Sequence, residues 1–192
     1  MTRGTLELDK IWAASYFPQI RTILRSFIGR IVSVKISSNE DDIHNATDYC
    51  LEISTDKTKV ACRIRSVEYF YKYHEGGEFT LRKSRPSGVP TEYDKILLGS
   101  PRWYFYGWVD SSNVIIYWVF VDLDVFREKR LYEHPDSIKV NHDGSSGFVG
   151  YQIIKLHKAK AIKQKSKTVS EYLKDTQQMT LPRGHPRPRV PA

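Results

Sequence analysis

Cysteine is scarce in this chain, which has only two among its 192 residues. Cys50 and Cys62 do not form a CxxC pair, so the sequence predicts neither a disulfide framework nor a zinc knuckle. Each cysteine alternates with other residues in a segment that is typical of a β-strand. We therefore expect both to behave as small, buried hydrophobic residues.

Long hydrophobic runs are also absent. No segment approaches the apolar length that a helix needs to span a bilayer. The first residues, MTRGTLELDK, lack the basic-then-apolar order of a signal peptide. These features predict a cytoplasmic protein without a membrane partner.

Several chemical motifs are missing as well. The six histidines show no paired spacing for metal ligation, so the sequence predicts no metal site built from histidine. The sequence shows neither a GxSxG motif nor a recognisable cysteine–histidine pairing. This argues against the familiar hydrolases with a serine or cysteine nucleophile. The segment HDGSSG (142–147) is too short for a phosphate-binding loop and lacks its lysine, so we interpret it as a turn.

Positive charge and aromatic residues are plentiful instead. The chain has 30 Lys and Arg against 22 Asp and Glu, which gives a formal net charge of +8, and it has 12 Tyr, 8 Phe and 4 Trp. This aromatic content predicts a folded protein. The basic surplus favours a polyanion such as DNA or RNA, because neutralising phosphates releases condensed counterions.

Local patterns predict the order of the elements. Apolar residues at helical spacing indicate a helix over about 18–28, and Thr91 is a good N-cap for a second, short helix. Between these helices, segments 47–54 and 58–66 have the pattern of a β-hairpin. Together with the later strands and helices, this order predicts an α+β fold, an α/β sandwich on a mixed β-sheet flanked by helices.

The length suits one domain with a proper core. We expect residues 1–157 to form a single globular domain and residues 158–192 to form a basic, proline-rich tail. The tail has little apolar surface to bury, so truncation after about residue 158 is expected to leave a folded core. The same truncation is expected to flatten the salt dependence of nucleic-acid binding, by roughly one unit of slope for each phosphate that the tail neutralises.

Charged residues of both signs occur on four consecutive predicted elements. Residues two or four apart share a face of a strand, and residues three apart share a face of a helix. The same-face groups are Asp48 with Glu52, Arg63 with Arg65, Glu78 with Arg82, and Glu92 with Lys95. One interpretation is a solvated sheet face with surface ion pairs, each of which contributes little to stability. The other interpretation is a shared cleft that these charges line.

Two further segments bear on nucleic-acid binding. RKSRP (82–86) is a compact basic loop that is either a contact for a phosphate backbone or a solvated turn. In the aromatic strand 103–108, alternation places Trp103 and Phe105 on one face and the aromatic residues at 104, 106 and 108 on the other. One of these faces is expected to be core, and the other is either covered sheet or a platform for stacking bases.

Over roughly residues 18–150 the order of elements resembles the PD-(D/E)XK, or restriction-endonuclease-like, family. That family has a helix, a strand bearing an aspartate, a strand bearing (D/E)xK, and then a helix and further strands. In this chain the helix is 18–28, Asp48 matches the aspartate, and CRIR (62–65) stands where (D/E)xK belongs. Arg63 occupies the place of the acid and Arg65 that of the lysine, so both positions depart from the family pattern.

The resemblance implies a restriction-endonuclease-like core that acts on nucleic acid. It implies Mg²⁺ bound by Asp48 and Glu78, with Glu92 as a further candidate acid, because Mg²⁺ prefers hard oxygen ligands. Arg65 would stabilise charge on phosphate and could not serve as a base, because arginine does not deprotonate. The remaining candidates for phosphate contacts are Arg63, Arg82, Lys83, Arg85 and Lys95. The patterns EFTLR, TEYDKI, FYGW and NHDGSSGF also resemble a group of proteins from phages and mobile elements.

Two functional hypotheses remain open. The first is a Mg²⁺-dependent nuclease that hydrolyses phosphodiester bonds, in which the metal activates water. The second is a non-catalytic binding module on the same core, which holds nucleic acid or a host protein, as a phage inhibitor of host defence would. The hypotheses differ in whether a second carboxylate reaches Asp48. A homodimer is compatible with both, and a phage-encoded protein would act in the host cell cytoplasm.

Overall fold

The computed structural model describes residues 15–28, 31–36, 49–53, 56–72 and 77–171, with the backbone alone for 31–36, 49–53, 56–57 and 72. Its elements are α2 (Phe17–Phe27), β1 (Ile31–Ile36), β2 (Tyr49–Ile53), β3 (Asp56–Ser66), α4 (Glu68–Lys72), β4 (Glu78–Ser84), α5 (Glu92–Leu97), β5 (Trp103–Val109), β6 (Ile115–Asp122), α6 (Leu123–Glu128), the 3-10 helix η1 (Leu131–Glu133), β7 (Ser137–Val140), β8 (Gly147–Gln152), α7 (Ile153–Lys158) and β9 (Ile162–Lys165). Among the described residues, no helix is long and apolar enough to cross a membrane.

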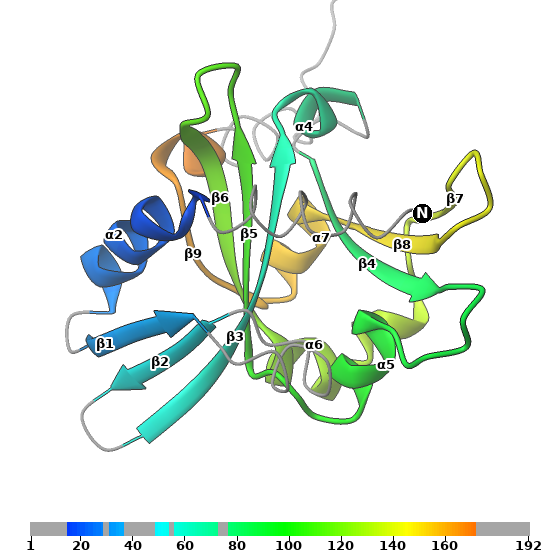
Figure 1. The fold of residues 1–192 in the computed structure, drawn as a ribbon, viewed down its shortest axis with the longest axis horizontal. Coiled ribbons are helices and arrows are strands. Elements are labelled where there is room, and N and C mark those ends of the chain that lie inside the picture. Colours follow the sequence, from blue (N-terminus) through cyan, green and yellow to red (C-terminus); the bar gives the residue numbers. More distant parts are fainter. Residues whose placement is uncertain (1–14, 29–30, 37–48, 54–55, 73–76, 172–192) are drawn as a thin grey trace, which may run out of the picture.

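The strands form two separate sheets (Figure 1). The main sheet has the order β1-β2-β3-β5-β6-β9, in which β3 and β5 are parallel and the other neighbours are antiparallel. The second sheet is antiparallel and has the order β4-β8-β7. The protein is therefore an α+β protein with two sheets and short helices, as the sequence predicted at that level. The prediction placed β4 with the other strands, whereas it belongs to the second sheet.

The main sheet buries apolar side chains on both faces. On one face, Ile20 and Leu24 of α2 pack against Val60 and Ile64 of β3 and against Phe105 of β5. On the other face lies a larger core, which the main sheet shares with the second sheet and with α5, α6 and α7 (Figure 1). The molecule is thus layered as helix, main sheet, and a mixed layer of strands and short helices.

The aromatic strand β5 contributes to both cores. Phe105 faces α2, while Tyr104, Tyr106 and Trp108 face the second sheet, and all four side chains are almost completely buried. Of the two interpretations of the other face, covered sheet is confirmed and the stacking platform is wrong, because the second sheet covers the tyrosine face. The alternation itself is confirmed, since it separates the two cores as the period of a strand requires.

The two helices expected from the sequence are present. The first described helix runs from Phe17 to Phe27 and carries Pro18 in its first turn, where a missing N–H costs no hydrogen bond. Thr91 caps α5: its Oγ1 accepts from the backbone N–H of Asp94, and the Asp94 carboxylate accepts from the Thr91 N–H in return. This capping box fixes where α5 begins and hence the position of Glu92, one residue after the cap.

The predicted boundary between domain and tail does not match the structure. Residues beyond 158 add strand β9 to the edge of the main sheet, where Ile162 is in register with Val121 of β6. Val169 is fully buried in the larger core, and the Ser166 hydroxyl accepts from its backbone N–H. The fold therefore extends to at least residue 171, and a truncation after 158 would remove an edge strand and part of the core. Residues 172–192 lie outside the described part of the chain.

We expect Val169→Ala to lower the free energy of unfolding by about 1.5–2 kcal/mol, because each buried methylene contributes about 0.8 kcal/mol and a small cavity adds to the cost. Lys167→Ala is the matched control two residues away. Its side chain is 91% exposed and forms a surface ion pair with Glu171, so its removal should leave stability nearly unchanged. Urea unfolding of both variants measures the difference. Equal stabilities would show that this segment is the dispensable tail that the sequence suggested.

Candidate functional site

Arg63 and Arg65 lie in the part of β3 that pairs with β5. The predicted hairpin is confirmed, but β2 pairs only with residues 56–60 of β3. Arg63 and Arg65 are instead in parallel register with Tyr106 and Trp108 of β5. Both arginines share a strand face with the buried Ala61, which belongs to the core beneath the second sheet. They therefore point from the main sheet towards β4 and β8.

Glu92 is the acceptor that holds Arg63 in place. Its carboxylate accepts from the Arg63 guanidinium at 2.6 Å, from the backbone N–H of Arg82 at 3.1 Å, and from the Tyr104 hydroxyl. The side chains of Arg63 and Glu92 are each only 15% exposed. Arg63 also donates to the backbone carbonyl of Thr80 at 3.2 Å. This ion pair thus joins β3, β4, β5 and α5, and its role is structural.

Three guanidinium groups surround one aromatic ring. The guanidinium carbons of Arg63, Arg65 and Arg82 lie 5.7, 5.8 and 5.7 Å from the centroid of Phe148, within the range of a cation–π contact. Cross-strand register explains the meeting, because Phe148 of β8 lies directly opposite Arg82 of β4. Arg63, Arg65 and Arg82 are called the arginine cluster below.

Among the described residues, the arginine cluster has more positive charge than the neighbouring carboxylates neutralise. In the described part of the chain, Glu92 is the single carboxylate that forms a salt bridge with any of its members. Partial burial and the neighbouring Arg63 guanidinium lower the pKa of Arg82, and the attraction of Glu92 does not cancel this. The buried Nε of Arg82 has no hydrogen-bond partner among the described residues. The cluster therefore favours an additional anion.

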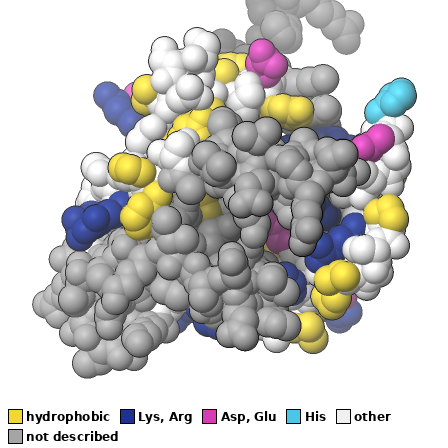
Figure 2. Space-filling view, viewed as in Figure 1, with side chains coloured by type: hydrophobic (Ala, Val, Ile, Leu, Met, Phe, Trp, Pro, Cys, Tyr) yellow, Lys and Arg dark blue, Asp and Glu magenta, His cyan; other side chains and the backbone are white. Residues whose placement is uncertain are grey.

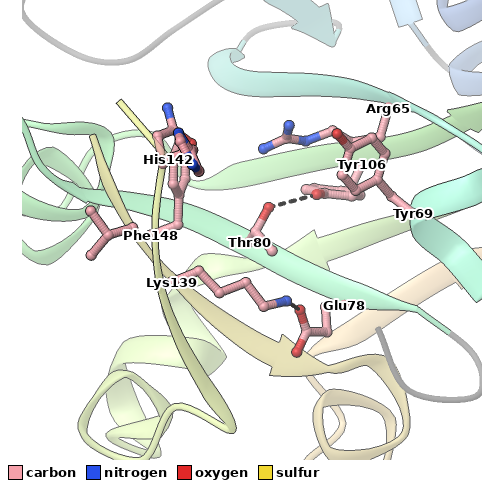
Figure 3. A pocket seen from close by; sticks show the side chains of 10 residues that line it. Arg65, Tyr69, Glu78, Thr80, Tyr106, Lys139, His142 and Phe148 are labelled. Carbon is pink, nitrogen blue, oxygen red and sulfur yellow. Dashed lines mark hydrogen bonds and ion pairs between the residues drawn. The ribbon is translucent and has the colours of Figure 1, made fainter. Parts of the chain in front are cut away.

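A cavity of about 260 Å³ opens beside the arginine cluster, between the two sheets (Figure 3). Residues from β3, α4, β4, β5, β7, the turn after β7, and β8 line it, namely Arg65, Tyr69, Glu78, Thr80, Tyr106, Lys139, Val140, Asn141, His142 and Phe148. Figure 3 shows His142 and Phe148 on one side and Arg65, Tyr69 and Tyr106 on the other. Thr80 lies between these two sides, and its hydroxyl forms a hydrogen bond of 2.7 Å with the Tyr106 hydroxyl.

Glu78, one of the two predicted metal ligands, also lines this cavity. It is 3% exposed, and its carboxylate accepts from the Lys139 ammonium group. Gly150 leaves room for this pair, because a Cβ there would come within 2.9 Å of Glu78 Oε2. Lys139 thus offsets the negative charge of this buried carboxylate.

The described part of the chain does not bring together the acids that were proposed to bind Mg²⁺. Asp48, the first of them, lies outside the described part of the chain. Glu92 contacts the backbone of Arg82, four residues along β4 from Glu78, which corresponds to about 13 Å along the strand. Within the described ranges, no group of three or more His, Cys, Asp or Glu side chains is placed to hold a metal ion. The Mg²⁺ site at Asp48 and Glu78 stays a prediction.

The other predicted phosphate contacts lie around the loop after β4. Lys83 is exposed, with its ammonium nitrogen 5.3 Å from the Tyr93 ring centroid. The Arg85 guanidinium donates to the backbone carbonyls of Val89 and Pro90, so it braces its own loop. Lys95 lies in the last turn of α5. In the space-filling view, Lys and Arg side chains gather over β4 and α5 (Figure 2).

Sequence reasoning missed the residues that complete the site. The pattern around Phe148 indicates only a turn and a strand, and Lys139 belongs to a strand, β7, that no pattern predicts. Both side chains reach the arginine cluster or the cavity through cross-strand pairing, since Phe148 is opposite Lys139 on one side and Arg82 on the other. The pairing of Arg82 with Phe148 joins residues more than sixty positions apart, and such a distant pairing leaves no local signal in the sequence.

Comparison with known proteins does not assign the site. No protein-family model matches this sequence, and a search among curated proteins also gives no match. The function is therefore inferred from the residues of the site and from the order of the elements.

Proposed function

We propose that the protein is a nucleic-acid-binding module that holds phosphate groups at the arginine cluster. The observation that carries the proposal is the convergence of three guanidinium groups on Phe148 with a single carboxylate among them in the described part of the chain. Counting the described residues alone, three positive charges and one negative charge leave a net charge of +2 at a partly buried position. Arginine binds phosphate groups well, because its planar guanidinium can donate two parallel N–H···O bonds to one phosphate.

The members of the arginine cluster have different roles in this proposal. Arg63 is committed to Glu92 and to the Thr80 carbonyl, so it supplies positive potential and little direct contact. Arg65 and Arg82 make no salt bridge with a described residue, and both lie against the Phe148 ring. We therefore assign the phosphate contacts to Arg65 and Arg82.

The order of elements supports a restriction-endonuclease-like core for this module. A helix is followed by three antiparallel strands, a crossover, and a strand that returns parallel to the third. Arg63 and Arg65 then stand on the strand where that family carries its catalytic acid and lysine. A guanidinium group in the place of the acid repels a metal ion, which favours binding over Mg²⁺-dependent cleavage. Cleavage through Asp48 and Glu78 would require the Glu78–Lys139 pair to open.

We expect the protein to bind labelled DNA or RNA oligonucleotides in EDTA as tightly as in Mg²⁺. Contacts of this kind give dissociation constants of about 1–100 µM at physiological salt, and binding tightens as salt is lowered. Fluorescence anisotropy measures the affinity, and electrophoresis of the same samples detects cleavage in Mg²⁺ or Mn²⁺. Metal-dependent cleavage that Asp48→Asn abolishes would establish the nuclease hypothesis instead. A failure to bind any oligonucleotide at low salt would contradict the proposal.

A further inference from the structure

We infer that the cavity beside the arginine cluster receives one unpaired nucleobase, so that the protein selects single-stranded over double-stranded nucleic acid. The inference rests on the proposed function and names the substrate class of the same site. Arg65 is a member of the arginine cluster, Phe148 is the ring that the cluster surrounds, and both side chains line the cavity. A nucleotide with its phosphate on Arg65 therefore has its base at the mouth of the cavity.

Flat groups suited to stacking line the entrance. The Arg65 guanidinium carbon lies 5.5 Å from the Tyr69 ring centroid and 5.8 Å from that of Phe148, so it sits between two aromatic rings. Tyr69 is 42% exposed, which leaves ring surface open for contact. Proteins that recognise single strands stack the splayed bases on aromatic rings and on arginine planes in this way.

Polar groups deeper in the cavity offer both donors and acceptors to the edge of a base. The Thr80 and Tyr106 hydroxyls lie at the centre in Figure 3, and Glu78 and Lys139 lie on one side of them. A base presents both donors and acceptors on its Watson–Crick edge, and buried sites read that edge through hydrogen bonds. An inorganic phosphate bound to Arg65 would not need these hydrogen-bonding groups.

The size of the cavity restricts the ligand to one base. Its volume of about 260 Å³ is slightly below the range of about 300–1,000 Å³ that is usual for sites of drug-sized molecules. A duplex does not enter such a space, and a paired base would first have to leave its stack at an energetic cost. An unpaired base enters without that cost, and the preference for single strands follows.

Three probes of one sequence test the inference on the wild-type protein: a labelled single strand, the same strand in a duplex, and the same strand with abasic sites. We expect the single strand to bind at least tenfold more tightly than either of the others, which is the effect of stacking about one base. Equal affinities for the three probes would overturn the inference. If the three probes bound equally well but Arg65→Ala still lowered their affinity, the proposed function would stand and the base-binding inference would fail. If no probe bound, both would fail.

A pair of tyrosine variants gives the matched control. Tyr69→Ala removes the exposed ring beside Arg65, and we expect it to reduce single-strand affinity about tenfold, to the level of the abasic probe. Tyr71→Ala removes a tyrosine of the same helix that is 65% exposed and does not line the cavity, and it should bind as the wild type does. Unchanged affinity in Tyr69→Ala, in a variant that melts like the wild type, would contradict base stacking at this entrance.

Discussion

Replacing Glu92 with alanine should lower the free energy of unfolding by about 3–5 kcal/mol, the usual cost of removing one partner from a buried ion pair. The Glu92 carboxylate accepts from Arg63, from the Tyr104 hydroxyl and from the Arg82 backbone. Its removal leaves these donors without this acceptor. It also takes a negative charge away from three neighbouring guanidinium groups, so their mutual repulsion increases.

Chemical denaturation of Glu92→Ala and of Glu128→Ala measures this effect. Glu128 lies at the end of α6 and is exposed, so its removal should change stability by less than about 0.5 kcal/mol. If Glu92→Ala were as stable as this control, Glu92 would not be the residue that holds the arginine cluster together. The Arg63 guanidinium would then be available to ligands, and its structural role would have to be abandoned.

Alanine substitutions at Arg63 and at Arg65 should affect different properties, although the two residues share one strand face. The first should lower stability and the second should lower nucleic-acid affinity. Arg63→Ala leaves the Glu92 carboxylate buried without its cation, so stability should fall by about 3–5 kcal/mol. Arg65 forms no salt bridge with any described residue, so Arg65→Ala should melt within a few degrees of the wild type. Its nucleic-acid affinity should fall by about tenfold or more, because a hydrogen bond to a charged group contributes about 1.5–3 kcal/mol.

Thermal melting and anisotropy titrations of the two variants, side by side, distinguish these roles. A large decrease in stability in both variants would show that Arg65 is also a structural residue, buried in an ion pair. Normal binding by a stably folded Arg65→Ala would remove this residue from the phosphate site. The sequence pattern places both arginines on the same face of β3 and does not distinguish a structural arginine from a phosphate-binding one. The two variants make that distinction.

Local structure was largely predictable from the sequence. The helix at 17–27 follows from its apolar spacing, the start of α5 follows from its Thr91 cap, and the β2–β3 hairpin follows from alternation and a polar turn. Alternation also predicted that Arg63 and Arg65 share a face. These features depend on residues close in sequence, where periodicity and capping chemistry act directly.

The site itself was only partly predictable, because it depends on contacts between distant segments. Alternation shows that Arg63 and Arg65 share a face, but it does not show that this face meets β4 and β8. The parallel pairing of β3 with β5 follows a crossover that contains α4, β4 and α5, and β4 leaves the main sheet within it. No local sequence pattern predicts that Phe148 lies opposite Arg82.

Strand β9 shows how composition alone misleads. Ile162–Lys165 lies among lysines, and a lysine-rich segment is usually solvated. Its burial rests on a few apolar residues, Ala161, Ile162 and Val169, which fill the edge of the larger core. Lys163 and Lys167 are exposed and Lys165 is half-buried, so the mean composition hides the few residues of this segment that are buried.

The salt dependence of oligonucleotide binding tests the central claim, phosphate binding at the arginine cluster, most directly. For a single strand, the logarithm of the binding constant falls against the logarithm of salt concentration with a slope of about −0.7 for each neutralised phosphate. Arg65→Ala should therefore make the slope shallower by about 0.7. Arg102→Ala removes an equal charge from a side chain that is 58% exposed and pairs with Asp124, away from the cavity, and it should keep the wild-type slope. Identical slopes for wild-type protein and Arg65→Ala would contradict the claim.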